Sequence, residues 1–427
     1  MNSTNKKLIN NFLSLAILQG TNYILPLITF PYLVRVLGPA HYGLIAFSQA
    51  FITYFIVLTD YGFNLTATRQ IAVNKSNKEN VRSIFSTVIV IKFIFAFVYF
   101  LLMAAIVFSI DKFREVWTLY FITYGMVIGN VLFPIWFFQG MEQMKYITLL
   151  NIGSKFISTA AIFIFVRNVN DFLYVPLINS VSVILFGIIS IILIFRVYRI
   201  SFSLRYVRNI TKQLYDGWHV FISQIAINLY TASSTFILGL FTNNTIVGYY
   251  ASGEKIVKAV QGLITPIAQT VYPHVNSLAA KSKELAFAFL KKLFLFISVS
   301  TLAISAILLL SADFLVSLIL GNEYTHSIII VKILSFLPFI VGLSNLFGIQ
   351  TMLTFDMKKE FSRILVSAGI MSVILAFVFV PYFKQIGTAI SVLLTESIIT
   401  VAMFIVLYRR GYRFLGLKRR RSEADHV

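Results

Sequence analysis

Stretches of about 20 consecutive apolar residues recur along this chain and constrain its fold more than any other feature. A helix needs about 20 such residues, each rising about 1.5 Å, to cross the hydrocarbon core of a bilayer. Of the 427 residues, 58% are hydrophobic and only 12% are charged, whereas soluble domains carry about 25% charged residues. Such a chain could not cover its own surface in water. We therefore expect an all-α integral membrane protein.

The apolar stretches predict about twelve transmembrane helices, arranged as two lobes of six. The predicted spans lie near 10–34, 44–64, 84–109, 118–139, 148–166, 172–195, 220–241, 249–272, 293–313, 328–352, 364–382 and 387–408. A polar link at 196–219 separates the halves, and its basic residues favour a helix lying at the membrane surface; a solvated linker is the alternative. The expected domains are therefore residues 1–208, including the basic link, and residues 209–427, ending in a basic tail.

Lysine and arginine are distributed unequally between the two sides of the predicted membrane. The loops and chain ends on one side hold 26 of them, and the loops on the other side hold five. Because cytoplasmic loops carry the excess of basic residues, we expect both termini in the cytoplasm and an even number of crossings. The net charge of +20 is then explained by topology and by contacts with lipid headgroups, and we expect no nucleic-acid partner.

The two halves show a weak internal repeat at an offset of 205 residues, which aligns Gly43 with Gly248. Polar residues spaced i, i+4, i+7 and i+11 lie on one face of a helix. Such faces occur in three predicted spans: Gln49, Thr53 and Asp60; Gln224, Asn228, Thr231 and Thr235; and Glu254, Lys258, Gln261 and Thr265. Because lipid cannot satisfy polar groups, these faces favour a wet cavity between two repeats. Hydrogen bonding within a closed bundle is the alternative.

Charged residues also lie inside the predicted spans, where each costs about 2.5–3.5 kcal/mol near the bilayer centre. The excess is cationic, which favours a basic, water-filled cavity for an anionic group. Snorkelling to the headgroups is the alternative for lysines near the ends of spans, and a structural ion pair is the alternative for Glu254 with Lys258. The residues are Lys92, Lys155, Lys255, Lys258, Lys332, Asp60, Glu254 and Glu396, with Arg35 near an outer edge.

Several kinds of site have no motif in this sequence. The chain has no phosphate-binding P-loop, no HExxH or paired-histidine motif and no cysteine. We therefore expect no metal site, no cofactor and no nucleotide-driven transport.

Three stretches carry a resemblance to a known family: Leu18–Ala72, which contains RVLGPAHYG and TDYGFNLTATR, Pro134–Met144 and Gly248–Val275. They resemble bacterial O-antigen flippases, the Wzx-type members of the polysaccharide exporter (MOP) superfamily. The resemblance implies a V-shaped pair of six-helix lobes around a cationic cavity, in the bacterial inner membrane. It implies as substrate an oligosaccharide on undecaprenyl pyrophosphate, moved from the inner to the outer leaflet by alternating access. Membrane lipids and other membrane proteins of polysaccharide assembly are the further partners implied.

The candidate site residues rest on depth in the membrane and on the polar faces rather than on the resemblance. The expected substrate-binding residues are Lys92, Lys155, Lys255, Lys258, Arg35, Gln19, Gln49, Gln224, Asn228 and Gln261.

Coupling to an H⁺ or Na⁺ gradient would need a carboxylate in the membrane. Glu396 is the preferred candidate because no basic residue lies within one helical turn of it, whereas Glu254 has Lys258 one turn away. Asp60 is expected to pair with Arg69 at a cytoplasmic gate. In the alternative interpretation, Glu396 meets Lys92 or Lys332 and only holds the bundle together.

Two other functions are compatible with a polytopic helical protein. One is a drug or cation antiporter of the same superfamily. The other is an enzyme, a membrane polysaccharide polymerase, which typically needs a large outer loop for its catalytic residues. The predicted outer links are short, at 35–43, 110–117, 167–171, 242–248, 314–327 and 383–386, so we expect no enzymatic activity.

Overall fold

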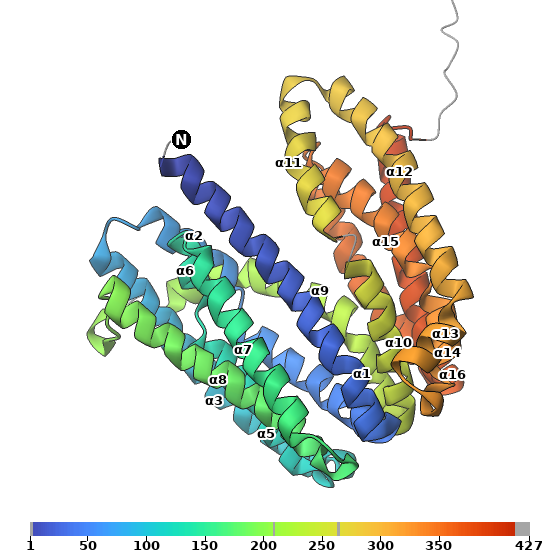
Figure 1. Cartoon of the computed structure of the whole chain (residues 1–427). Coiled ribbons are helices and arrows are strands. Elements are labelled where there is room, and N and C mark those ends of the chain that lie inside the picture. Colours follow the sequence, from blue (N-terminus) through green and yellow to red (C-terminus); the bar gives the residue numbers. More distant parts are fainter. Residues whose placement is uncertain (1–2, 208–209, 263–264, 415–427) are drawn as a thin grey trace, which may run out of the picture.

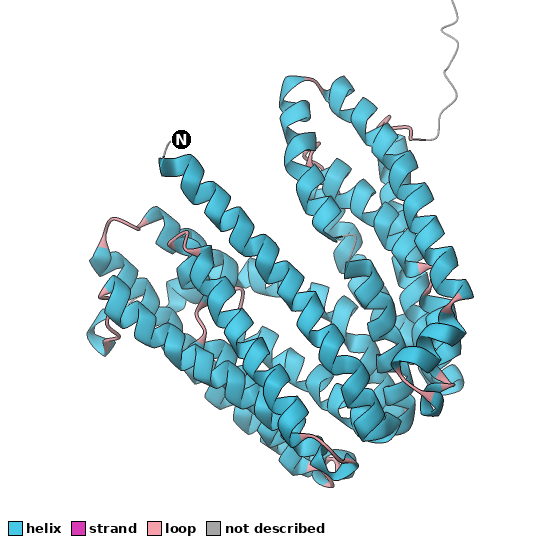
Figure 2. Cartoon of the chain, viewed as in Figure 1, coloured by secondary structure: helices cyan, strands magenta, loops and turns pink. Residues whose placement is uncertain are grey.

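The computed structural model describes residues 3–207, 210–262 and 265–414. Side chains are described from Leu25 onward, except at 223, 226–227, 229–232, 263–267 and 269–270. Within these ranges the chain forms helices and connecting turns, and no strand occurs there (Figure 2). The helices make two bundles that meet at one end and diverge toward the end that carries the N-terminus (Figure 1). The expected all-α fold with two lobes is confirmed.

The first lobe contains α1 to α8. Its helices are α1 (Ser3–Asp60), α2 (Phe63–Val73), α3 (Lys78–Ser109), α4 (Asp111–Arg114), α5 (Trp117–Leu132), α6 (Ile135–Gly140), α7 (Met144–Phe165) and α8 (Tyr174–Leu193). The second lobe contains α9 (Ile210–Phe241), α10 (Asn244–Gly262), α11 (Thr265–Lys281), α12 (Lys283–Leu310), α13 (Ala312–Ile319), α14 (Ser327–Leu334), α15 (Leu337–Asn345) and α16 (Lys358–Arg409). Single turns of 3₁₀ helix lie at Val169–Leu173, Leu204–Tyr206 and Asn322–Tyr324, and π-helical turns at Ile194–Tyr198 and Leu346–Leu353.

Eight helical segments of the described chain are long and apolar enough to cross a membrane. Two of them, Leu25–Val73 and Lys358–Arg409, have 49 and 52 residues, and about 20 residues suffice for one crossing. Each therefore holds two of the predicted spans. Counting these two segments twice, and adding the spans predicted in α9 and in α10 with α11, gives the expected twelve.

Each of the long helices α1 and α16 is broken at one residue with positive φ. In α1 the break is Gly38, at φ 65° and ψ 172°, a conformation that only glycine adopts readily, and Pro39 follows it. In α16 the break is Lys384, at φ 51° and ψ −127°. Both residues lie between two predicted spans, so each break turns the chain back across the membrane.

Where the lobes touch, a residue of each lobe contacts the equivalent of its own neighbour in the other lobe, as expected for a two-fold repeat. A Cβ atom added at Gly43 of α1 would lie 1.9 Å from the carbonyl oxygen of Asn244. A Cβ atom at Gly248 of α10 would lie 1.9 Å from the carbonyl oxygen of Pro39. The offset of 205 residues relates Pro39 to Asn244 and Gly43 to Gly248, so the equivalent helix ends cross on the pseudo-two-fold axis. Glycine is required at both positions because the backbones touch.

A second reciprocal feature lies beside this crossing. The hydroxyls of Ser48 and Thr123 are 3.5 Å apart, and those of Ser252 and Ser327 are 3.3 Å apart. All four side chains are buried, and each pair joins residues 75 positions apart in its own lobe. The same interhelical hydrogen bond therefore recurs in the two lobes.

Further side chains join the lobes at the end where the bundles meet. Lys112 of α4 donates to the carbonyl oxygens of Gly239 and Thr242 at the end of α9. Tyr324 donates to the carbonyl oxygen of Val34 at 3.0 Å. These contacts close the end of the molecule opposite the N-terminus.

The expected domain boundary at 208–209 falls on positions outside the described residues. Immediately after it, α9 packs against both lobes. The ring of Phe221 stacks on Tyr61, in the turn after α1, with centroids 4.4 Å apart, whereas Phe241 at the other end of α9 meets Phe377 of α16 at 5.6 Å. Helix α9 therefore bridges the two bundles.

The first part of the basic link, up to Val207, does not form the surface helix that its composition favoured. Arg199 takes a left-handed conformation at φ 55°, which ends the helical path of α8. Between Arg199 and Val207 the chain contains only the 3₁₀ turn Leu204–Tyr206, whereas residues 210–219 of the predicted link are helical and form the start of α9. The backbone N–H of Ser203 donates to Ser86 Oγ at 3.3 Å, and Ser83 Oγ donates to the carbonyl oxygen of Tyr206 at 2.9 Å. These hydrogen bonds to α3 take the place of those that a helix would make within itself.

Candidate anion-binding cavity

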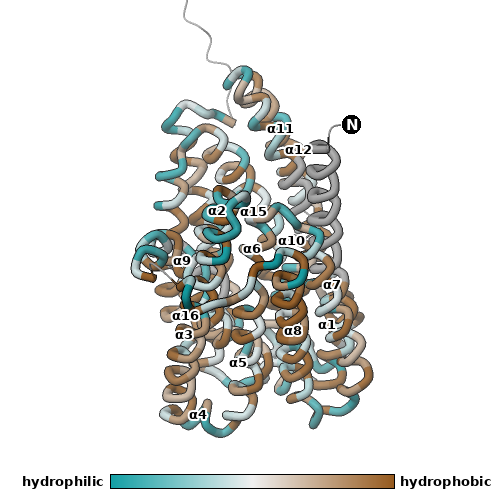
Figure 3. The backbone as a smooth tube through the Cα atoms, turned by 90° about the vertical axis from the view of Figure 1, so that its left-hand side faces the viewer, coloured by the Kyte–Doolittle hydropathy of each residue, from teal (hydrophilic) through white to brown (hydrophobic). Residues whose placement is uncertain are grey.

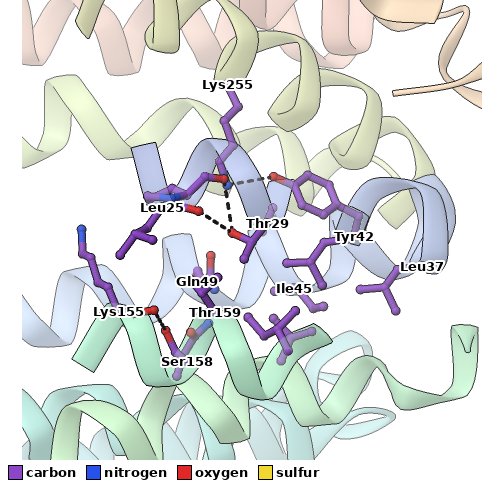
Figure 4. Close-up of a pocket in the computed structure, with 16 residues that line it drawn as sticks. Leu25, Thr29, Leu37, Tyr42, Ile45, Gln49, Lys155, Ser158, Thr159 and Lys255 are labelled. Atoms are coloured by element: carbon purple, nitrogen blue, oxygen red, sulfur yellow. Dashed lines mark hydrogen bonds between the residues drawn. The ribbon is translucent and has the colours of Figure 1, made fainter. Parts of the chain in front are cut away.

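A cavity of about 210 Å³ lies in the first lobe where it approaches α10 of the second lobe. Three helices of the first lobe, α1, α7 and α8, supply its walls, and Lys255 reaches into it from α10 (Figure 4). Its polar lining residues are Thr29, Tyr42, Gln49, Lys155, Ser158, Thr159, Asn179 and Lys255.

Lys255 crosses between the lobes to reach this cavity. Its ammonium lies 3.5 Å from the hydroxyl of Tyr42 and 4.8 Å from the ring centroid of Phe30. A lysine over an aromatic ring gains about 0.5–2 kcal/mol, depending on how far it is desolvated. No described carboxylate forms an ion pair with Lys255. Its positive charge is therefore held by aromatic groups, which leaves it available to an anion.

The opposite wall comes from one face of α7. Lys155, Ser158 and Thr159 are spaced i, i+3 and i+4, which places them together on that face. Gln49 of α1 and Asn179 of α8 complete the polar lining. None of the described lining residues carries a carboxylate. The cavity thus combines two cations with hydroxyl and amide groups, a combination that suits an anionic, polyhydroxylated ligand.

Lys92 lies away from the cavity, in the core of the first lobe. Its side chain is 1% exposed, and its ammonium lies 3.0 Å from Asp60 Oδ1 and 3.3 Å from Asn130 Oδ1. This ion pair ties α3 to the end of the long helix α1. The expected pairing of Asp60 with Arg69 is therefore wrong, because Asp60 binds Lys92 instead. Arg69 lines a separate cavity of about 400 Å³ with Gln70 and Asp216.

Glu254 and Lys258 form the intrahelical pair that their spacing allowed. Lys258 Nζ lies 3.0 Å from Glu254 Oε1, and Tyr250 Oη donates to the same oxygen at 3.2 Å. The Lys258 side chain is 56% exposed. The charge of Lys258 is therefore already neutralised by Glu254, and much of its side chain lies on the surface of the helix bundle.

The remaining candidates are spread over both lobes. Arg35 donates to the carbonyl oxygen of Leu318, at the end where the lobes meet. Asn228 Nδ2 donates to the carbonyl oxygen of Gln224, one turn earlier in α9. Gln261 is half-buried in α10. The side chain of Gln19 lies outside the described residues.

Glu396 is half-buried in α16, with Thr395 and Thr400 buried beside it. The alternative interpretation pairs Glu396 with Lys92 or Lys332. In the structure Lys332 instead pairs with Asp313 at 2.7 Å, and Lys92 pairs with Asp60.

The structure thus brings together three of the predicted residues, Gln49, Lys155 and Lys255. Their neighbours Thr29, Tyr42 and Asn179 also line the cavity but are not among the predicted residues. The spacing of Lys155, Ser158 and Thr159 could have pointed to this cavity, because it makes a polar face in the predicted span 148–166, in addition to the three faces described above. Tyr42 carried no such signal, since aromatic residues are frequent throughout the chain.

The chain is similar to known proteins over most of its length. Residues 8–279 match the protein family described as "Polysaccharide biosynthesis protein". The chain is 38% identical over 408 residues to a protein of Escherichia coli (strain K12) provisionally named an O-antigen transporter, covering 95% of this chain and 98% of that one. A Shigella dysenteriae protein with the same provisional name is 28% identical over 396 residues, covering 92% and 98%.

Solved structures share the fold at low sequence identity. The lipid II flippase MurJ, in an inward closed conformation, superposes with a TM-score of 0.71 at 12% identity, over 94% of this chain and 87% of that one. An inward-facing multidrug resistance MATE transporter of the MOP superfamily superposes with a TM-score of 0.70 at 16% identity, over 90% and 94%. These likenesses support the two-lobed fold.

Proposed function

Because the chain belongs to the polysaccharide biosynthesis protein family, we propose that it is a flippase for undecaprenyl-pyrophosphate-linked O-antigen oligosaccharide. It would move these units from the inner to the outer leaflet of the bacterial inner membrane. The names of its relatives and the fold shared with a lipid II flippase support this assignment. The observation that carries it is the cavity in which Lys155 of one lobe and Lys255 of the other line a single space.

The two lysines suit a pyrophosphate because hydrogen bonds between ammonium and phosphate are charge-assisted. A pyrophosphate held by Lys155 and Lys255 would contact both lobes at once. A ligand shifts a conformational equilibrium only by its difference in affinity between the states. An anion that bridges the lobes has such a difference, because moving the lobes apart at this point removes one of its two cations. Substrate binding would thereby be coupled to alternating access.

The other lining residues suit the sugar. Gln49, Asn179 and Thr159 offer amide and hydroxyl groups that can donate to and accept from sugar hydroxyls. The undecaprenyl chain would remain in the bilayer. The lining residues that the structure describes include no carboxylate, which disfavours a drug or cation antiporter, because a cationic cargo would meet only lysine charges among them.

Replacement of Lys255 tests the proposal. A strain that lacks its own flippase is complemented with the Lys255→Ala protein, and surface O-antigen is compared with membrane abundance of the protein. A charge-assisted hydrogen bond contributes about 1.5–3 kcal/mol, and 1.4 kcal/mol is tenfold in affinity. We therefore expect surface polysaccharide to fall by about tenfold or more, with Lys255→Arg retaining an intermediate level.

Lys145→Ala is the matched control, since Lys145 is an exposed lysine at the start of α7, outside the cavity. It should leave export unchanged. Accumulation of lipid-linked single units on the cytoplasmic face is the expected phenotype of Lys255→Ala. Normal export by a well-inserted Lys255→Ala protein would exclude this cavity as the pyrophosphate site, and accumulation on the outer face would indicate a polymerase instead.

A further inference from the structure

A second large cavity lies on the first lobe, where α3 passes the end of α8. Its volume is about 660 Å³, and every lining residue except Ser201 is apolar. Phe85, Val90 and Phe93 line it from α3, Ile191 from α8, and Phe202 from the link. Phe93 remains 44% exposed and Phe202 41% exposed. The cavity is therefore a groove that is open toward the surroundings of the helix bundle.

The groove is turned away from the second lobe. In Figure 1, α3 and α8 lie on the side of the first lobe farthest from α12 and α16. Figure 3, which views the molecule from that side, shows α3, α5 and α8 facing the viewer with long hydrophobic stretches. The substrate cavity uses the opposite end of α8, at Val175 and Asn179. The groove is thus remote from the proposed transport path.

Arginines gather at one end of the groove. Arg196 adjoins the lining residue Phe195, and Arg199 lies two residues before the lining residue Ser201. Arg82, one helical turn before Phe85, donates to the carbonyl oxygen of Arg199 at 3.4 Å and lies over the ring of Tyr206 at 5.2 Å. Arg82 therefore contacts the backbone of Arg199, and all three arginines lie on the segments that line this end of the groove.

The arginines at this end of the groove lack some of the hydrogen bonds and ion pairs that they could form with described residues. The Nε of Arg82 is buried and has no hydrogen-bond partner among the described residues. None of the three arginines forms an ion pair with a described carboxylate. Arg196 and Arg199 are exposed. The groove is apolar, and the arginines at its end are positively charged. A ligand with an anionic headgroup and an attached acyl chain would complement both parts.

We propose that the groove binds an anionic phospholipid of the leaflet on the side of the basic link. One acyl chain lies between α3 and α8, and the phosphate lies against Arg82, Arg196 and Arg199. Arginine suits this role because its planar fork binds phosphate oxygens in pairs. The bound phosphate would also join Arg199 of the link to Arg82 of α3, adding to the hydrogen bonds of Ser203 and Tyr206 that hold the link on that helix.

Lipid retention by the full-length, detergent-purified protein tests this inference. Native mass spectrometry is recorded after addition of phosphatidylglycerol or phosphatidylcholine with identical acyl chains. We expect several-fold greater retention of phosphatidylglycerol. The variant Arg82→Gln/Arg196→Gln/Arg199→Gln should retain the two lipids equally, and Arg196→Gln alone, at an exposed site that folding does not need, should lower phosphatidylglycerol retention in part.

Filling the groove gives an independent measurement. Val90→Trp should reduce retention of both lipids, whereas Phe97→Trp, at an exposed position of α3 that does not line the groove, should not. Arg114→Gln/Arg167→Gln, which removes two exposed arginines outside the groove, is the charge control. Equal retention of both lipids by the wild-type protein, or no effect of Val90→Trp, would overturn the inference.

Competition with undecaprenyl phosphate separates the two sources of a phosphate with an apolar tail. If the carrier lipid displaces phosphatidylglycerol, and Val90→Trp abolishes its binding, the groove belongs to the carrier and the inference is wrong. If phosphatidylglycerol stays bound, the groove is a phospholipid site. Because the readout is lipid retention rather than export, a negative result leaves the proposed flippase function untouched.

Discussion

At the scale of single residues, a charge inside the membrane part of this protein has one of two fates. Lys92 is 1% exposed and is neutralised by Asp60 with help from Asn130, and Lys258 is paired with Glu254. Lys255 instead lies against Phe30 and Tyr42 at a cavity wall. The first arrangement stabilises the fold, and the second leaves a charge for a ligand. Mutations should separate these two roles.

The first prediction concerns the buried pair. Breaking a buried ion pair by removing one partner costs about 3–5 kcal/mol, because the remaining charge stays buried without compensation. Lys92→Met should therefore lower thermal stability in detergent and reduce membrane abundance, and adding Asp60→Asn should restore much of both. If the double variant were less stable than either single variant, the pair would not be the cause. If it regained stability without regaining export, Lys92 would have a role in transport as well.

The second prediction concerns energy coupling, for which Glu396 remains our candidate. It is a half-buried carboxylate in the membrane-spanning helix α16, and ionisable residues inside such helices commonly mark ion pathways. Glu396→Gln should produce a folded protein that binds substrate but no longer depends on the H⁺ or Na⁺ gradient. Flipping by purified protein in vesicles, with and without each gradient, measures this. Gradient dependence equal to that of the wild type, at any rate, would remove Glu396 from the coupling role.

At the scale of helices, the contact between α1 and α10 depends on two glycines. The backbone carbonyl of Pro39 would lie 1.9 Å from a Cβ at position 248, and backbone cannot move aside as a flexible side chain can. Any side chain at this position must force the helices apart. The junction of the lobes is therefore as sensitive to a single methyl group as the packed core of a soluble protein.

The third prediction follows from this contact. Gly248→Ala should open the joined end of the lobes, where a cavity of about 500 Å³ is lined by Asn244. With Asn244→Cys as reporter, labelling by a membrane-impermeant maleimide should rise several-fold. Gly253→Ala in the same helix is the control, since its Cβ would lie 3.1 Å from the Ile330 side chain and 3.3 Å from the Ser327 carbonyl oxygen, far more than the 1.9 Å at Gly248. Equal labelling of the two glycine variants would contradict the proposed role of the crossing.

At the scale of the whole molecule, the lobes are joined at one end and diverge at the end that carries the N-terminus (Figure 1). The contacts of Lys112, Tyr324 and Arg35 all lie at the joined end. If the termini are cytoplasmic, as the distribution of basic residues predicts, the diverging end faces the cytoplasm. That arrangement would admit a substrate made on the inner leaflet.

The fourth prediction tests this orientation. The chain contains no cysteine, so single cysteines can be introduced without removing others. Asn243→Cys, between α9 and α10, should react with an impermeant maleimide in intact spheroplasts. Arg205→Cys, in the link, should react only after permeabilisation. The reverse pattern would invert the topology and with it the direction of transport.

The sequence by itself determined the membrane class, the crossings, the two lobes and the repeat, because these depend on properties read along the chain. Runs of apolar residues mark spans wherever they occur, and the offset of 205 residues already pairs Gly43 with Gly248. What the sequence could not supply is which distant side chains meet. Lys92 and Asp60 are 32 positions apart, and Lys255 and Tyr42 are 213 apart.

Only the tertiary structure decided those partnerships, since they follow from how helices cross rather than from spacing within one helix. For that reason the sequence predicts a pair between Asp60 and Arg69, its nearer cation along the chain, whereas in the structure Lys92 of α3 lies against Asp60. The first part of the link differs from its expected helix for the same reason: its composition allows a helix, whereas hydrogen bonds that Ser203 and Tyr206 make with Ser86 and Ser83 of α3 hold this part out of one. Local pattern determines the elements, and packing between them determines the site.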